Sequence, residues 1–201
     1  MALTIQFYDN NAEQYAETTV NLDMSRTYDR FLQYLPLGAS ILDAGCGSGR
    51  DSRYFINRGY HVTMLDASAG MCQCAEELTG QKALCMKFAE IDFAERFDGI
   101  WACASLLHVP RMELEDVLAR FHCALRSNGV LYASWKYGKE ERLDGDRFYC
   151  DMTSAEIQLL LTRIGLFDCL ECWISDDVLV MNKNQKWLNV ILRKKKKNKH
   201  F

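Results

Sequence analysis

Apolar and polar positions show two kinds of spacing, helical and strand-like, that alternate along the chain. A helical face is predicted over 28–35, where apolar residues recur at i, i+3, i+4 and i+7 before Pro36. Short apolar runs rich in β-branched and aromatic residues come next, and each precedes a stretch with helical spacing. The predicted strands are 40–44, 61–65, 83–88, 98–103 and 130–135, the last after a turn at Asn128-Gly129, and the predicted helices run from 50 to 59, from 68 onward and over 114–125. This alternation predicts an α/β fold whose parallel sheet is covered on both faces.

The end of the chain has a different pattern. Thr153 and Ser154 are N-cap candidates for a helix that Gly165 terminates. Two strand-like runs follow, over 166–175 and 186–193, with only a loop between them. Because that loop is too short for a helical crossover, the last two strands are predicted to pair antiparallel.

Length and charge indicate one folded unit with a basic end. The 201 residues, 49% of them hydrophobic, suit a single core, so we predict one domain over 1–193, with a helical N-terminal cap over 1–38. The net charge of −3 becomes −9 when the six cations between Arg193 and Lys199 are left out, so the body is acidic. Residues 194–201 are predicted to be a disordered tail, with an arm for nucleic acid as the alternative.

No apolar stretch reaches the roughly 18 residues of a membrane span, and the N-terminus does not resemble a secretory signal. We therefore predict a cytoplasmic protein without membrane contact. Nine scattered cysteines are expected to stay reduced. The pairs Cys72/Cys74 and Cys169/Cys172 lie on a predicted helix and a predicted strand, without the turn of a zinc knuckle, so no metal is predicted.

The segment "SILDAGCGSGR" at 40–50 places three glycines directly after a strand. A dinucleotide fingerprint G-x-G-x-x-G would need its third glycine where Arg50 stands. Asp43, just before the glycines, would repel a pyrophosphate but suits an ammonium group. Asp66, at the end of "VTMLD", can accept hydrogen bonds from ribose hydroxyls. These features predict S-adenosylmethionine (SAM) as the ligand, and a turn that only packs helix on sheet is the alternative.

The stretches "ILDAGCGSGRDSRYF", "GYHVTMLDASAGM" and "RFDGIWACASLLHV" resemble successive motifs of class I SAM-dependent methyltransferases, over about residues 7–135. "GCGSGRDS", "GYHV" and "SWKYG" are most similar to the small tellurite-resistance methyltransferase-like group. The resemblance implies a Rossmann-like three-layer α/β/α sandwich with a seven-stranded, mostly parallel sheet of order 3-2-1-4-5-7-6 and strand 7 antiparallel. It also implies that SAM is converted to S-adenosylhomocysteine (SAH).

The resemblance further implies where the cofactor lies. Asp43 and the glycine turn would line its methionine part, and Asp66 would bind its ribose. Ala67 and Met71 would flank the adenine, and an acid at Glu90-Ile91, or else Asp92, would lie near the adenine amine. Tyr15 matches a tyrosine that folds over the cofactor in related enzymes, or it packs only locally. The full predicted set is Tyr15, Asp43, Gly45, Cys46, Gly47, Asp66, Ala67, Met71, Glu90 and Ile91.

His108 follows the fourth predicted strand and Lys136 the fifth, so both should reach the sheet edge near the transferred methyl group, and Arg147 lies in a polar stretch that can fold back over it. His108 is a candidate base or substrate contact, or it has only a structural role. The three residues predict a small acceptor with an anionic group, held under a lid formed by the polar stretch "KEERLDGDRFY". The alternative is that the two cations pair with nearby acids such as Glu140, Glu141 and Asp146. "ACASLLHV" differs from the Asn/Asp-Pro-Pro-aromatic tetrapeptide, which disfavours exocyclic amines of bases as acceptors. An RNA (tRNA) methyltransferase that uses the basic tail and a non-catalytic SAM-binding accessory protein remain alternatives.

Overall fold

The structure is a computed structural model and describes residues 2–179 and 184–196. The helices are α1 (Ala2–Asn10), α2 (Ala12–Thr19), α3 (Ser25–Leu32), α4 (Arg50–Ile56), α5 (Ala69–Thr79), α6 (Leu114–Ala124) and α7 (Ser154–Ile164). The strands are β1 (Ser40–Ala44), β2 (His61–Asp66), β3 (Ala83–Cys85), β4 (Phe97–Ala102), β5 (Leu125–Lys136), β6 (Glu141–Asp144), β7 (Arg147–Cys150), β8 (Phe167–Asp176) and β9 (Lys186–Lys194). Short 3-10 helices lie at Phe88–Glu90, Leu106–His108 and Arg111–Glu113.

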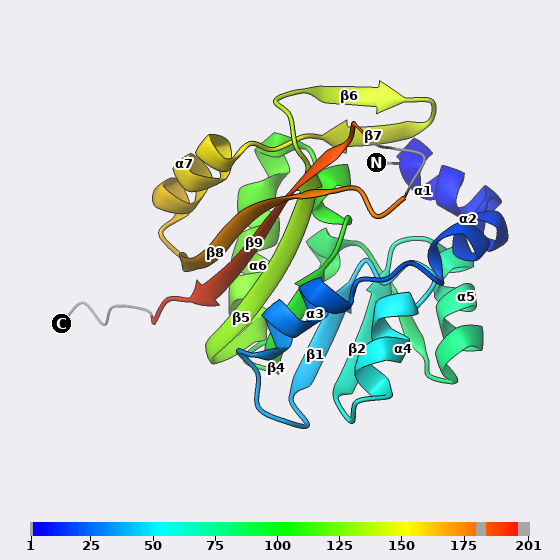
Figure 1. Cartoon of the computed structure of the whole chain (residues 1–201), viewed down its shortest axis with the longest axis horizontal. Coiled ribbons are helices and arrows are strands. Elements are labelled where there is room, and N and C mark those ends of the chain that lie inside the picture. The colour runs from blue at the N-terminus through cyan, green and yellow to red at the C-terminus, as the bar shows by residue number, and fades with distance from the viewer. Residues whose placement is uncertain (1, 180–183, 197–201) are drawn as a thin grey trace.

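Seven strands form one twisted sheet in the order β3-β2-β1-β4-β5-β9-β8 (Figure 1). The first five pair in parallel, and β9 is antiparallel to both of its neighbours. The strands β6 and β7 form a separate antiparallel hairpin. Counted without this hairpin, the order is the predicted 3-2-1-4-5-7-6 with strand 7 antiparallel, so the predicted Rossmann-like α/β/α fold is confirmed.

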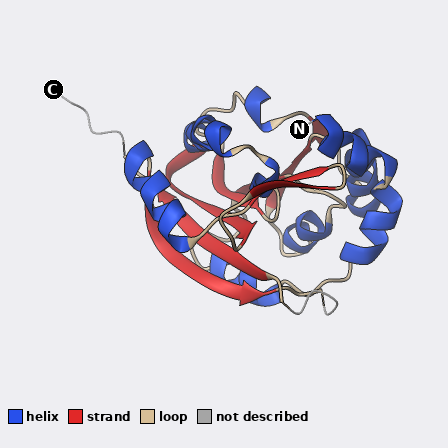
Figure 2. Ribbon diagram, turned by 90° about the horizontal axis from the view of Figure 1, so that it is seen from above, coloured by secondary structure: helices blue, strands red, loops and turns tan. Residues whose placement is uncertain are grey.

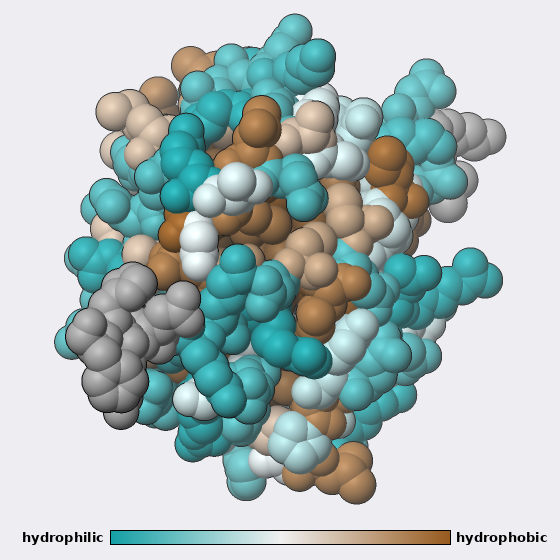
Figure 3. All heavy atoms as spheres, turned by 90° about the vertical axis from the view of Figure 1, so that its left-hand side faces the viewer, coloured by the Kyte–Doolittle hydropathy of each residue, from teal (hydrophilic) through white to brown (hydrophobic). Residues whose placement is uncertain are grey.

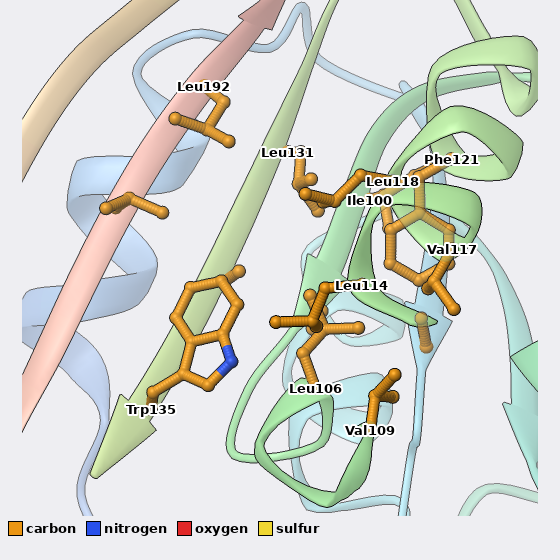
Figure 4. Close-up of a cluster of buried hydrophobic side chains, with 14 of the residues drawn as sticks. Ile100, Leu106, Val109, Leu114, Val117, Leu118, Phe121, Leu131, Trp135 and Leu192 are labelled. Carbon is orange, nitrogen blue, oxygen red and sulfur yellow. The ribbon is translucent and has the colours of Figure 1, made fainter. Parts of the chain in front are cut away.

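Apolar side chains fill both faces of the sheet. On one face, α6 and α7 pack against β4, β5 and β9, and Figure 4 shows Leu114, Leu118 and Phe121 of α6 beside Ile100 and Leu131. On the other face, α3 and α4 cover the sheet through the aromatic residues Tyr28, Phe31, Phe55, Trp101 and Tyr132. Burying such large side chains contributes about 1.5–3 kcal/mol each, so the strand ends that carry the site are held by a rigid core.

Within the predicted cap segment 1–38, α1 and α2 lie at the carboxyl end of the sheet, whereas α3 covers one of its faces. Thr4 of α1 accepts a hydrogen bond from the backbone N–H of Phe148 at 2.9 Å, which joins the first helix to β7. Seen from above, the hairpin and the N-terminal helices lie over the same end of the sheet (Figure 2). The stretch predicted as a polar lid is therefore the hairpin β6–β7, and its partner in covering that end is α1.

Several predicted boundaries were wrong. The helix predicted over 28–35 is α3 and ends at Leu32, and β3 ends at Cys85 rather than at residue 88. The turn predicted at Asn128-Gly129 is a bulge inside β5, where pairing with β4 jumps from Leu125 to Val130 and Asn128 has a φ of +66°. Lys194, predicted to be in the tail, belongs to β9; residues 197–201 of that tail lie outside the described residues.

The side of α7 and β8 exposes single apolar residues such as Leu159 and Ile174. Figure 3 views the molecule from this side and shows hydrophilic atoms around the apolar groups. Within residues 2–179 and 184–196, no helix has the length and apolar character needed to cross a membrane.

Candidate active site

A cavity with an empty volume of about 1080 Å³, partly open to solvent, lies at the carboxyl ends of β1, β2 and β4. Its walls come from the turns after these strands and after β3, and from α1 and α2. Parallel sheets place their ligands at this edge, because several loops meet there. Eight residues of the predicted site line it: Tyr15, Gly45, Cys46, Gly47, Asp66, Ala67, Met71 and His108.

The glycine turn after β1 has a backbone path that only glycine follows without strain. The N–H groups of Gly45 and Cys46 both donate to the carbonyl of Leu65, at 2.8 and 2.9 Å, which ties the turn to β2. Gly45 has a φ of +82°, and a Cβ there would lie 2.4 Å from the Ser105 Cβ. The turn therefore brings bare backbone into the cavity wall.

Asp66 ends β2 and turns its carboxylate toward the glycine turn. One oxygen accepts from the Gly47 N–H and the other from the Ser68 N–H, both at 2.9 Å. Burial raises the pKa of Asp66, while these N–H groups oppose the rise. The arrangement holds a fixed acceptor at the cavity wall, beside the glycine backbone.

Asp43 does not line the cavity. Its side chain is buried and accepts a hydrogen bond from the Ser52 hydroxyl at 2.6 Å. Burial, followed by the charge of Asp51, raises the pKa of Asp43 to about 8. Its predicted contact with the cofactor stays a prediction.

Arg50 and Asp51 line the cavity, although the sequence did not indicate them as ligands. The guanidinium donates two hydrogen bonds to the Asp51 carboxylate, at 2.6 and 2.9 Å. Tyr28 and Trp101 donate to the same carboxylate, Trp101 at 2.7 Å. Although burial opposes it, the Arg50 charge and these donors lower the pKa of Asp51. The ion pair therefore holds the Arg50 guanidinium at the cavity wall, where its N–H groups that are not bonded to Asp51 can donate to a ligand.

Glu90 and Ile91 also stand outside the cavity, and their predicted place near the adenine stays a prediction. The Glu90 carboxylate is exposed and accepts from the Lys87 backbone N–H at 2.6 Å, as a cap of the short helix that follows. Ile91 is 1% exposed and belongs to the core. Met86, Lys87 and Phe88 line the cavity in their place. The rival Asp92 is exposed and does not line it either.

His108 lines the cavity and is held on both sides. Its Nδ1 lies 2.7 Å from the carbonyl oxygen of Phe148 and its Nε2 lies 2.9 Å from the Tyr8 hydroxyl. Burial, together with the charges of Arg147 and Lys136, lowers the pKa of His108 to about 4, against the bond to Phe148. The imidazole is therefore neutral at physiological pH. Tyr8 was missed because nothing in the sequence links α1 to the loop after β4.

Lys136 and Arg147 come together as predicted, but around Tyr149 and not in the cavity wall. Lys136 Nζ lies 3.8 Å from the centroid of the Tyr149 ring, and the Arg147 guanidinium lies 5.4 Å from the same centroid. Arg147 also stacks on Phe7 at 4.8 Å and pairs with Asp144 at 3.7 Å. The predicted direct contact of the two cations with an acceptor has no support in the cavity lining.

The alternative that the two cations pair with nearby acids holds for Arg147, with an acid other than the three named. Glu141 accepts from the Arg111 backbone N–H at 2.7 Å, and the ion pair of Arg147 is with Asp144. In the described part of the chain, no group of three or more His, Cys, Asp or Glu side chains is arranged to hold a metal ion. Cys72 and Cys74 lie on α5, and Cys169 and Cys172 lie on β8, as the sequence predicted.

Part of the chain matches a known family. Residues 41–129, less than half of the chain, match the family model described as a methyltransferase domain. The match and the sheet order agree with the resemblance to class I SAM-dependent methyltransferases.

Among curated relatives, a malonyl-[acyl-carrier protein] O-methyltransferase of Salmonella typhimurium is 39% identical over 97 residues, which are 46% of this chain and 37% of the relative. An uncharacterized methyltransferase of Geobacillus thermodenitrificans is 27% identical over 67% of this chain and 64% of the relative. The chain spans 37%, 52% and 43% of the first three curated relatives it matches, about half their length or less.

Solved structures show the same fold at low identity. A 1,6-didemethyltoxoflavin-N1-methyltransferase of Burkholderia thailandensis, with bound 1,6-didemethyltoxoflavin and SAH, has a TM-score of 0.79 at 24% identity and covers 97% of this chain and 88% of its own. A TehB-like SAM-dependent methyltransferase of Corynebacterium glutamicum has a TM-score of 0.69 at 21% identity, over 92% and 99% of the two chains. At such identities the likeness extends to the fold alone, so the tellurite-resistance group stays a prediction.

Proposed function

We propose that the protein is a SAM-dependent methyltransferase that acts on a small-molecule acceptor. The observation that carries the proposal is the contact of Asp66 with the Gly47 N–H at 2.9 Å, because it puts an acid suited to a ribose diol beside bare glycine backbone in one cavity. SAM is a nucleoside joined to an amino acid. The acid can accept hydrogen bonds from the ribose hydroxyls, and the turn without Cβ atoms lets the ligand lie against the backbone.

Each part of SAM has a matching set of residues. The glycine turn, through Gly45, Cys46 and Gly47, faces the methionine part, and the unused N–H groups of Arg50 suit its carboxylate. Asp66 takes the ribose hydroxyls. Ala67 and Met71, with Met86 and Phe88, line the part of the cavity that suits adenine, and Tyr15 of α2 covers the site.

When bound, SAM supplies a methyl group that is already activated by the positive sulfur. The chain therefore needs only to hold the acceptor in line, exclude water and remove a proton where the acceptor carries one. The helices α1 and α2, which contribute Tyr8 and Tyr15 to the wall, perform the exclusion.

The acceptor is less closely defined than the cofactor. The names of the relatives specify O-methylation of a malonyl group on a carrier protein in one case and N1-methylation of a heterocycle in another. The predicted anionic acceptor depended on Lys136 and Arg147, and neither lines the cavity. Membership of the tellurite-resistance methyltransferase-like group is supported by the motifs "GCGSGRDS" and "SWKYG".

Calorimetry with SAM and SAH tests the cofactor, and a metabolite extract supplemented with SAM tests turnover through the SAH that forms. We expect both ligands to bind and SAH to accumulate. Tight binding of NAD with none of SAM or SAH would contradict the proposal.

Two other functions lead to different results in the same assays. A non-catalytic SAM-binding protein would bind the ligands without forming SAH, and a neighbour described as the [4+2]-cyclase SpnF, with a TM-score of 0.69 at 16% identity, has this fold as well. An RNA methyltransferase would bind RNA with steep salt dependence that disappears when 193–201 are removed.

A further inference from the structure

A chain of hydrogen bonds with one direction runs from the cavity to the backbone of β7. The Phe148 carbonyl oxygen can only accept, so the His108 Nδ1 that lies 2.7 Å from it carries a hydrogen. A neutral imidazole then has only a lone pair at Nε2, and the Tyr8 hydroxyl 2.9 Å away must donate its hydrogen there. Tyr8 therefore has no hydrogen left to offer to a ligand.

The surroundings of His108 preserve this direction. Lys136 and Arg147 stand behind the imidazole, on the side of Tyr149, whose ring centroid lies 5.1 Å from that of His108. A proton on Nε2 would reverse the bond to Tyr8, but it would add a third positive charge to this half-buried group. Neither cation lines the cavity, but the charge of Arg147 also reaches Tyr8 and Tyr15 directly.

The cavity end of the chain offers oxygen lone pairs and aromatic rings. Tyr15 stands edge-on to Tyr8, with ring centroids 5.1 Å apart, and its hydroxyl is the second one at this place. A hydrogen bond joins the two tyrosine side chains; because the Tyr8 hydrogen goes to His108, Tyr15 is the donor, and the Tyr8 oxygen keeps a second lone pair. Burial raises the pKa of both hydroxyls, and the charges of Arg147 at Tyr8 and of Arg50 and Arg147 at Tyr15 oppose the rise.

Resting on the proposed function, we propose that the acceptor is an uncharged aromatic molecule whose nucleophilic atom carries a hydrogen, as an aromatic hydroxyl or a ring N–H, and that the Tyr8 oxygen receives this hydrogen bond. A carboxylate has no hydrogen to give and would place its negative charge against the lone pairs of Tyr8. The acceptor class is thus the one that the hydrogen-bond direction selects, and it differs from the malonyl group in the names of curated relatives.

The same chain gives the proton a path. The nucleophile forms its new bond to the methyl carbon, the carbon–sulfur bond breaks and its electron pair stays on the sulfur of SAH. The nucleophile's proton passes to the Tyr8 oxygen while the proton of Tyr8 moves to His108 Nε2, so the charges balance. A weak base suffices, because a hydroxyl or ring nitrogen that has gained a methyl group is a strong acid until it loses its proton.

Binding of two small probes to the SAH-loaded protein tests the acceptor class. SAH affinity is measured first, because a protein that does not bind SAH would contradict the proposed function and not the acceptor class. Phenol and benzoate are then titrated by NMR, with His108 signals as the reporter. We expect phenol to bind at least about tenfold more tightly than benzoate. Equal or tighter binding of benzoate, or no binding of phenol at millimolar concentration, would overturn the proposal.

Two variants assign the selectivity to the hydrogen-bond chain. Tyr8→Phe should weaken phenol binding about tenfold and leave SAH affinity unchanged, while Tyr137→Phe, outside the cavity, should change neither. His108→Phe frees the Tyr8 hydrogen, so the preference for phenol over benzoate should shrink several-fold. An unchanged preference in a folded His108→Phe protein would show that His108 does not set the direction.

Discussion

The Asp66 carboxylate and the Gly47 backbone N–H are 2.9 Å apart, so the ends of β2 and β1 are joined within the cavity wall. Because a second N–H, that of Ser68, holds the other oxygen at the same distance, the carboxylate has a fixed orientation before any ligand binds. An acceptor fixed in this way loses little side-chain entropy when it binds a diol.

Replacing this carboxylate should cost cofactor affinity. Asp66→Ala removes charged acceptors for two hydroxyls, each bond of this kind being worth about 1.5–3 kcal/mol, so we expect SAM affinity to fall at least about tenfold. Calorimetry measures the loss. The control is Asp168→Ala, whose exposed carboxylate on β8 pairs with Lys195. Equal affinity in the two variants would remove Asp66 from the cofactor site.

Two glycines of the turn offer a matched pair. Gly45→Ala and Gly47→Ala both put a Cβ on a residue with positive φ, at +82° and +52°, which costs about 1–2 kcal/mol. Only Gly45 also meets a neighbour, the Ser105 Cβ at 2.4 Å, whereas no atom lies within 4 Å at Gly47. Overpacking adds about 1–3 kcal/mol.

Thermal unfolding of both glycine variants measures the difference. A chain of this size loses about 2–4 °C per kcal/mol, so Gly45→Ala should melt several degrees below Gly47→Ala. Equal melting temperatures would mean that the turn moves away from Ser105 at no cost.

Asp43 should make stability depend on pH. Its pKa is raised to about 8 by burial and by the Asp51 charge, so the folded protein binds a proton that the unfolded chain releases near pH 4. The contribution of this proton is full below about pH 4 and is lost as pH rises toward 8, by at most about 1.4 kcal/mol per unit. Asp43→Asn keeps a neutral side chain and should flatten the slope.

Urea unfolding between pH 5 and pH 8, in steps, measures that slope. Asp168→Asn, an exposed carboxylate on β8, is the control and should keep the wild-type slope. The interpretation fails if Asp43→Asn loses stability with pH as steeply as the wild type.

The sheet could be predicted because its signals are local. Alternating runs of apolar residues define each strand and helix, and the short loop before β9 requires antiparallel pairing. The N-terminal helices were predicted only as a cap, since their contact with β7 through Thr4 and Phe148 joins residues 144 positions apart. The bulge at Asn128 looked like a turn because both need a residue with positive φ.

The cofactor half of the site could be predicted where a residue ends a strand, as Asp66 does, because such residues face the cavity by position. Asp43 lies inside β1, and the Glu90 carboxylate caps its own short helix, so neither lines the cavity and their predicted contacts with the cofactor stay predictions. Tyr8 and Arg50 could not be inferred, since their contacts depend on tertiary packing. On the acceptor side, His108 lines the cavity, whereas Lys136 and Arg147 do not, and the roles predicted for these three residues stay predictions.

The protonation of His108 is the last feature that can be measured directly. Its pKa is lowered to about 4 by burial and by the charges of Arg147 on β7 and Lys136 on β5, against the bond to Phe148, and the rings of Tyr8 and Tyr149 lie beside it. The unfolded chain takes up this proton near pH 6.5, so the stability that His108 contributes is full above that pH and is lost as pH falls toward 4.

By NMR, we expect the His108 signal, assigned by its loss in His108→Phe, to show no titration above about pH 5.5. Methyl transfer should show no loss of rate from His108 protonation near neutral pH. Lys136→Met removes one of the charges and should raise the His108 pKa by about half a unit to one unit, whereas Lys82→Met, whose exposed amine pairs with Glu76, should leave it unchanged. A wild-type His108 that titrates near pH 6.5 would mean that the imidazole is open to water, and the hydrogen-bond direction derived for Tyr8 would then no longer hold.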